Sequence, residues 1–224
     1  MVPLPRRILW VMSDRGVTRW LLTGGVIGPV LFVVVLLVEG WTRADYDPMT
    51  MFGSLLSLGD LGWQQVANFV LGGLLVLAGA FGLARVLTDG PGCRWGPRLI
   101  GLAGIGLALA GVFVTDPAQG YPPGTPLGMA TSPSWHGLLH LLVSTFVFFG
   151  LPAAMIVMAR RFPGEGTRWA LYCWLSAVGT LAFIVAAGRF TSVSGLLQRI
   201  AILLMLGWVA QVMWRFRREA ATAG

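Results

Sequence analysis

The chain of 224 residues contains no lysine, and all sixteen of its basic residues are arginine. Retinal and pyridoxal Schiff bases and Walker A phosphate loops each require a lysine amine, so these chemistries are excluded. Histidine and cysteine are scarce, with two of each. Charged residues make up only 11% of the chain, whereas a soluble domain has about a quarter. This composition excludes an ordinary soluble domain.

What the chain has instead is long apolar sequence, with 56% hydrophobic residues and a mean hydropathy of +0.76. Six runs each approach the roughly 20 residues that a helix needs to cross a bilayer. The sequence therefore predicts an all-α, polytopic membrane protein, a compact bundle of six transmembrane helices. We place them at about residues 20–40, 63–87, 98–115, 135–159, 168–188 and 194–214. One transmembrane domain, 20–214, then lies between a basic N-terminus, 1–19, and a basic tail, 215–224.

The arginines are distributed unevenly along this pattern. All except Arg43, Arg189 and Arg199 fall at the N-terminus, around the loops after the second and fourth runs, or at the C-terminus. The positive-inside rule therefore predicts that both termini are cytoplasmic. The distribution favours contact with anionic lipid headgroups and argues against nucleic-acid binding. Together with the all-arginine usage, we expect a multi-pass protein of the bacterial inner (plasma) membrane, in which Cys93 and Cys173 are free thiols.

Polar side chains gather in the outer third of the predicted helices. His136, His140 and Ser144 repeat every four residues and share one helix face, as do Gln64 and Asn68. The cytoplasmic halves are nearly free of polar groups. Because polar groups at such depth must face one another or a wet cavity, the pattern predicts a polar pocket that opens outward and is closed below.

Partners can be assigned to several of these groups. A guanidinium inside the membrane needs a carboxylate or carbonyl partner, and Asp116 and Glu39 lie nearest to Arg199 in depth. Glu39 and Arg43 are expected to form an ion pair at the rim of the bundle. Ser132, followed by Pro133, is expected to cap the fourth helix.

Four short segments carry a family resemblance: GWQQVANF (62–69), TDP (115–117) with PPGTP (122–126), SWHGLLH (134–140) and GLLQRI (195–200). In this order and spacing they resemble the prokaryotic membrane family catalogued as domain of unknown function 998. The resemblance spans nearly the whole chain and implies a six-helix membrane protein, but it supplies no reaction. The recurrent polar positions that it implies, our candidate ligand-binding residues, are Trp63, Gln65, Asn68, Asp116, His136, His140, Gln198 and Arg199.

Three classes of function fit such a pocket, and the sequence does not decide whether the protein is an enzyme. The favoured one is binding of a small ligand or lipid headgroup, or a structural role for the polar cluster. The second is a metal-dependent membrane hydrolase, in which His136, His140 and Asp116 hold a divalent metal such as zinc and leave a position for water. No third histidine completes that set. The last is a small-solute transporter, although the apolar cytoplasmic half offers no polar path.

Overall fold

The computed structural model describes residues 6–161 and 167–222, and within them the regular structure is helical, without strands. Six long helices are joined by loops that contain two short 3-10 helices, η1 (Gly53–Ser57) and η2 (Thr191–Val193). All six long helices are long and apolar enough to cross a membrane, which confirms the predicted all-α membrane fold. Their bounds are α1 (Arg6–Thr42), α2 (Gly62–Val86), α3 (Trp95–Val112), α4 (Trp135–Ala159), α5 (Thr167–Arg189) and α6 (Ser194–Thr222).

Helices α1 and α6 extend beyond the apolar runs that we placed in the membrane. Helix α1 begins at Arg6, and residues 1–5 of the expected N-terminal segment lie outside the described residues. Helix α6 continues through most of the expected tail to Thr222, with 223 and 224 outside the described residues. Apolarity marks where a helix crosses lipid, whereas helix propensity, which is high for arginine and alanine, decides where it ends.

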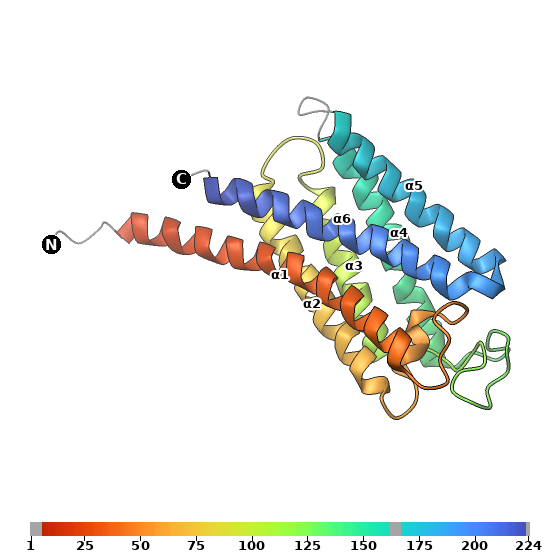
Figure 1. Ribbon diagram of the computed structural model, residues 1–224. Coiled ribbons are helices and arrows are strands. Elements are labelled where there is room, and N and C mark those ends of the chain that lie inside the picture. Colours follow the sequence, from red (N-terminus) through yellow and green to blue (C-terminus); the bar gives the residue numbers. More distant parts are fainter. Residues whose placement is uncertain (1–5, 162–166, 223–224) are drawn as a thin grey trace.

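The six helices form a closed ring in chain order. Each packs against the next, and α6 returns to pack against α1, with α1 and α6 lying side by side in Figure 1. One end of the ring carries the long connections 43–61 and 113–134 and the short turn 190–193; we call it the loop end. The other end carries the α2–α3 connection, the start of α1 and the end of α6, and we call it the arginine end.

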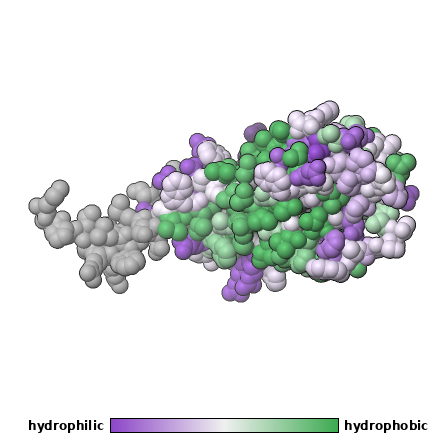
Figure 2. Space-filling model, turned by 90° about the horizontal axis from the view of Figure 1, so that it is seen from below, coloured by the Kyte–Doolittle hydropathy of each residue, from purple (hydrophilic) through white to green (hydrophobic). Residues whose placement is uncertain are grey.

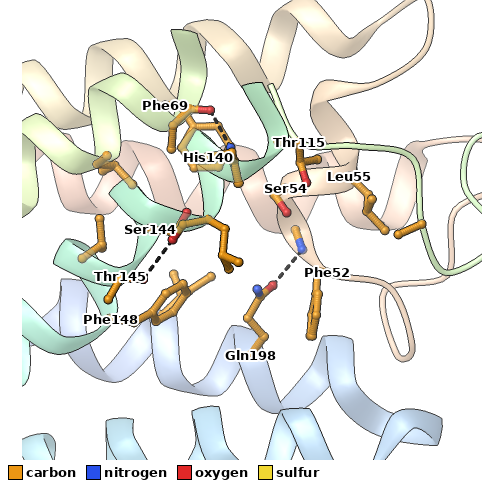
Figure 3. Close-up of a pocket in the computed structure, with 18 of the residues that line it drawn as sticks. Phe52, Ser54, Leu55, Phe69, Thr115, His140, Ser144, Thr145, Phe148 and Gln198 are labelled. Carbon is orange, nitrogen blue, oxygen red and sulfur yellow. Dashed lines mark hydrogen bonds between the residues drawn. The ribbon is translucent and has the colours of Figure 1, made fainter. Parts of the chain in front are cut away.

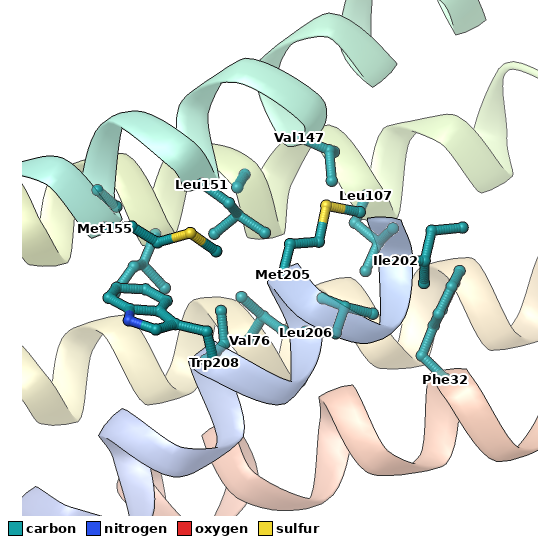
Figure 4. Packing of buried hydrophobic residues seen from close by; sticks show 14 of the residues in the cluster. Phe32, Val76, Leu107, Val147, Leu151, Met155, Ile202, Met205, Leu206 and Trp208 are labelled. Atoms are coloured by element: carbon teal, nitrogen blue, oxygen red, sulfur yellow. The ribbon is translucent and has the colours of Figure 1, made fainter. Parts of the chain in front are cut away.

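Large apolar side chains fill the interior of the ring toward the arginine end (Figure 4). Trp208 and Met155 are fully buried there, with Leu151 and Leu206 beside them. Helices α2 and α3 approach closely because glycines face each other: a Cβ on Gly104 would lie 2.8 Å from the backbone nitrogen of Leu77. Small residues allow such contacts between helices in lipid, so this half of the bundle is densely packed.

The outer surface of the ring is apolar, as a lipid-facing surface must be. Hydrophobic side chains cover much of the middle of the face shown in Figure 2, and hydrophilic ones are concentrated toward its two ends. Exposed apolar residues occur on every helix described, for example Val34, Leu74, Leu102, Leu141, Val178 and Leu203. Association with a lipid bilayer follows from this surface and from the length of the helices.

Candidate functional site

A cavity of about 410 Å³ lies inside the ring at its loop end (Figure 3). Its volume falls within the roughly 300–1,000 Å³ typical of small-molecule sites. All six helices contribute to its wall, through residues that include Phe32, Phe69, Leu107, His140, Ile184 and Gln198. The wall is mainly apolar, and its polar groups are concentrated toward the loops, where Ser54, Thr115 and Gln119 lie.

The cavity also has an open edge along α4. Leu138, Leu141 and Phe149 line the cavity, yet they remain 52%, 66% and 55% exposed on the lipid-facing side of the bundle. Ile184 of the neighbouring helix α5 also lines the cavity, and α5 is the least buried of the six spans. The cavity therefore borders the surface that faces lipid, as well as the loops.

The roof of the cavity is the loop from Tyr46 to Ser57, and Arg199 holds it in place. The guanidinium donates to the carbonyl oxygens of Pro48 and Met51, both at 2.9 Å, and to the hydroxyl of Tyr46. The expectation that Asp116 or Glu39 pairs with Arg199 is wrong. Carbonyl oxygens of the loop and the Tyr46 hydroxyl pair with the two terminal nitrogens of this buried cation instead, so Arg199 is occupied in holding the roof, and its Nε has no hydrogen-bond partner among the described residues.

Two glutamine side chains hold the same loop. Gln198 accepts a hydrogen bond from the backbone of Gly53 at 2.8 Å. Gln119 accepts from the backbone of Phe52 at 2.9 Å and donates to the carbonyl of Thr50 at 3.1 Å. Gln119 also lines the cavity, but the sequence did not identify it as a site residue. It lies in an irregular loop, where its backbone φ is +54°, and a loop has no repeat of polar residues that would mark a common face.

The two histidines of α4 contact the last turn of α3 and the two residues that follow it. His136 Nδ1 lies 2.8 Å from the carbonyl oxygen of Val114, and His140 Nδ1 lies 2.7 Å from that of Phe113 and 3.0 Å from that of Ala110. The last carbonyls of a helix have no partner within it. Since a carbonyl only accepts, Nδ1 of each ring carries the hydrogen. The spacing of four residues thus lets one face of α4 cap the C-terminal end of α3.

Asp116 caps α4 in return. Its carboxylate accepts from the backbone nitrogen of Ser134 at 2.8 Å and from the Ser134 hydroxyl at 2.6 Å. Ser134 is the N-cap of α4, so the expectation that Ser132 caps it is wrong. These hydrogen bonds from Ser134 hold the pKa of Asp116 below its usual range. A Cβ on Gly137 would overlap the Asp116 carboxylate, which explains a glycine in the first turn.

These contacts bring His136, His140 and Asp116 to one junction between α3 and α4. Within the described residues, however, no three or more His, Cys, Asp or Glu side chains are grouped so that they could hold a metal ion together. Of the three candidates, His140 and Asp116 line the cavity, and His136 does not. Zinc or another divalent metal at these residues stays a prediction.

On α2, Gln65 and Asn68 are buried, with 0% and 3% exposure. Asn68 donates to the carbonyl of Phe32 at 3.0 Å and to Gln65 Oε1 at 3.1 Å. Gln65 Nε2 and Asn68 Oδ1 have no hydrogen-bond partner among the described residues. Gln65 lines the cavity, whereas Trp63 is 65% exposed and lies outside it.

Glu39 and Arg43 form an ion pair at 3.6 Å, but the expectation that it lies at the rim is wrong. The two side chains are only 7% and 6% exposed. Arg43 also donates to the carbonyl oxygens of Leu56 and Leu61, at 3.2 and 3.1 Å. The loop between α1 and α2 folds over the pair and removes it from solvent.

The fold and the cavity together define a class: an integral membrane protein built as a six-helix ring with a mainly apolar cavity at one end. A family model described as protein of unknown function DUF998 matches residues 26–215, so the chain belongs to that family. This match confirms the family that the sequence motifs resemble. No curated protein and no solved structure matches the chain.

Proposed function

We propose that the protein is a binding protein for one lipid-like amphiphile, which it holds in the loop-end cavity. The observation that carries this proposal is the combination of an apolar cavity with an open edge on the lipid-facing side. A water-soluble ligand would require a more polar wall, whereas an acyl chain fits between Phe148, Ile202 and Met205. The dense packing around Trp208 and Met155 toward the arginine end favours binding over transport across the membrane.

Selectivity in such a site would come from its polar groups. Moving an acyl chain from the bilayer into the cavity releases little free energy, because lipid tails are as apolar as the leucine side chains of a protein. Hydrogen bonds to buried groups that otherwise lack a partner would then distinguish one lipid from another. Gln65 lines the cavity and has a buried Nε2 without a partner among the described residues. His140 also lines the cavity, and its hydrogen bonds to described residues use only Nδ1.

Photocrosslinking in nanodiscs tests this proposal. An uncharged glycerolipid with a diazirine at the middle of its acyl chain should label Ile202 and Met205, which are only 6% and 2% exposed. Ser144→Phe places a ring in the cavity and should abolish interior labelling. Leu142→Phe, on the exposed face of the same helix and outside the cavity, should leave it intact. Labels confined to exposed residues such as Leu175 would reject the proposal.

We further propose that the arginine end is cytoplasmic in a bacterial inner membrane and contacts anionic headgroups there. In support, arginines lie over tryptophan rings at this end: Arg98 over Trp95 at 5.7 Å and Arg217 over Trp214 at 5.1 Å. Cys93, in the α2–α3 connection, is partly exposed, whereas Cys173 is buried. A membrane-impermeant maleimide should therefore label Cys93 in inverted vesicles only. Labelling of Cys93 in intact cells would reverse the orientation, with Cys93→Ser as the control.

A further inference from the structure

Two residues that line the cavity each carry a polar atom that pairs with no described residue, an acceptor on His140 and a donor on Gln65. The His140 ring uses Nδ1 for the α3 carbonyls, and no hydrogen bond to a described residue uses Nε2, which is an acceptor in the neutral ring. Gln65 gives Oε1 to Asn68, and its donor Nε2 has no partner among the described residues.

The two residues line the same cavity, Gln65 from α2 and His140 from α4, and Phe69 lines it as well. The Phe69 and His140 rings meet edge to face with centroids 6.0 Å apart, and Figure 3 shows them together at the cavity. Gln65 precedes Phe69 by one helical turn, so it lies on the same face of α2. Gln65 is fully buried and His140 is 7% exposed. An unsatisfied donor as buried as Gln65 Nε2 is costly unless a bound group pairs with it, and the same bound group can donate to His140 Nε2.

The charges around the cavity restrict what that group can be. None of the described residues that line the cavity is an arginine, and the chain has no lysine. Asp116 is the charged residue on the wall, and both of its oxygens already accept from Ser134. A phosphate would meet a carboxylate without a compensating cation. An ammonium group would have to compete with Ser134 for Asp116.

We infer that the cavity selects an uncharged ester lipid with a free hydroxyl, the chemistry of a diacylglycerol. Gln65 Nε2 donates to an ester carbonyl, and His140 Nε2 accepts from the hydroxyl. This inference rests on the proposed binding function and names its ligand class. The acyl chains extend toward Ile202 and Met205 and through the open edge along α4 into the bilayer.

Competition against the uncharged diazirine glycerolipid measures this selectivity on the full-length protein in nanodiscs. The competitors are dioctanoylglycerol, its methyl ether at the free hydroxyl, the corresponding phosphate, and dodecylamine. Dioctanoylglycerol should reduce interior labelling at about threefold to tenfold lower mole fraction than the methyl ether, the ratio that one hydrogen bond provides. The phosphate and the amine should compete more weakly still.

Two variants assign the hydrogen bonds. His140→Asn keeps a donor near the position of Nδ1 for the α3 carbonyls but lacks Nε2, so it should lose the preference for the hydroxyl over the methyl ether. His136→Asn makes the same change at the matched cap outside the cavity and should keep that preference. In Gln65→Leu, dioctanoylglycerol should compete for interior labelling only as well as a dialkylglycerol, which has no ester carbonyl.

Equal or stronger competition by the phosphate or the amine overturns the inference, as does a hydroxyl preference that survives His140→Asn. In both cases interior labelling persists, and the binding function itself stands. A complete lack of interior labelling in the unmodified protein removes the binding function, and the inference with it. If Gln65→Leu does not fold, the competitor series with His140→Asn still tests whether the cavity selects the hydroxyl lipid.

Discussion

The two ends of the ring use the same helices for different purposes. At the arginine end, Trp208, Met155 and Met158 are fully buried and fill the interior. At the loop end, the same ring encloses a cavity, and the polar groups there are buried too. The comparison teaches that packing supplies stability at one end, whereas hydrogen bonds between loops and helices hold the other end open.

The arginine side chains also have different environments at the two ends of the ring. Arg43 and Arg199 at the loop end are buried and donate to loop carbonyls. At the arginine end, Arg98 and Arg217 lie over tryptophan rings. Substitutions that treat the two ends alike should therefore have unequal effects.

The largest effect is expected for Arg199→Met. This change removes the donors to Pro48, Met51, Gly195 and Tyr46, and among the described side chains only the Tyr46 hydroxyl then still donates to the Met51 carbonyl. Hydrogen bonds to a charged group contribute about 1.5–3 kcal/mol each, and their effects overlap, so we expect a loss of about 4 kcal/mol in the free energy of unfolding. Thermal unfolding in detergent measures it.

Arg98→Met is the matched control at the arginine end, where the side chain is exposed. It should change the free energy of unfolding by less than about 0.5 kcal/mol. Similar losses for the two variants would show that the roof loop does not depend on its arginine, and would contradict the division between the two ends.

A smaller difference is expected between Met155→Ala and Met205→Ala. Both side chains are buried, with 0% and 2% exposure, but Met205 borders the cavity and Met155 does not. Truncating a methionine in a packed core costs about 2–5 kcal/mol, partly because a new void forms. Met205 already faces a void, so its truncation should cost about 1–2 kcal/mol. Equal losses would mean that the cavity is filled by packing in the folded protein.

Much of the fold follows from the sequence, because the length of each apolar run must match the thickness of the bilayer that its helix crosses. The six apolar runs correspond to the six helices observed, and the depth of His140 and Asn68 places both in the loop-end half. The interpretation of Arg199 failed for a physical reason. Depth along a helix does not show which loop folds back over it, so the carbonyls of Pro48 and Met51 were not considered as partners.

The histidines show a second limit of sequence reasoning. A spacing of four places His136 and His140 on one face of α4, and that spacing suits a metal chelate and a helix cap equally well. What decides between them is where α3 ends, because its free carbonyls at Ala110 and beyond accept from both rings. Helix ends are the least certain part of a sequence-based prediction, so the capping role could not be foreseen.

The smallest effect, and the one that most directly sharpens the comparison, concerns Asp116. Hydrogen bonds from Ser134 lower the pKa of this carboxyl in the folded protein, so the ionised form stabilises the fold. That contribution is fully present above about pH 4, the usual pKa of aspartate, and is lost as the pH falls through the lowered pKa.

Since the carboxylate is partly solvated, we expect Asp116→Asn to cost no more than about 1 kcal/mol at neutral pH. The difference should shrink toward zero in acid, because the protonated wild-type side chain loses the same advantage. A melting temperature of Asp116→Asn that runs parallel to the wild type at every pH would show that the α3–α4 junction does not rely on a charged cap.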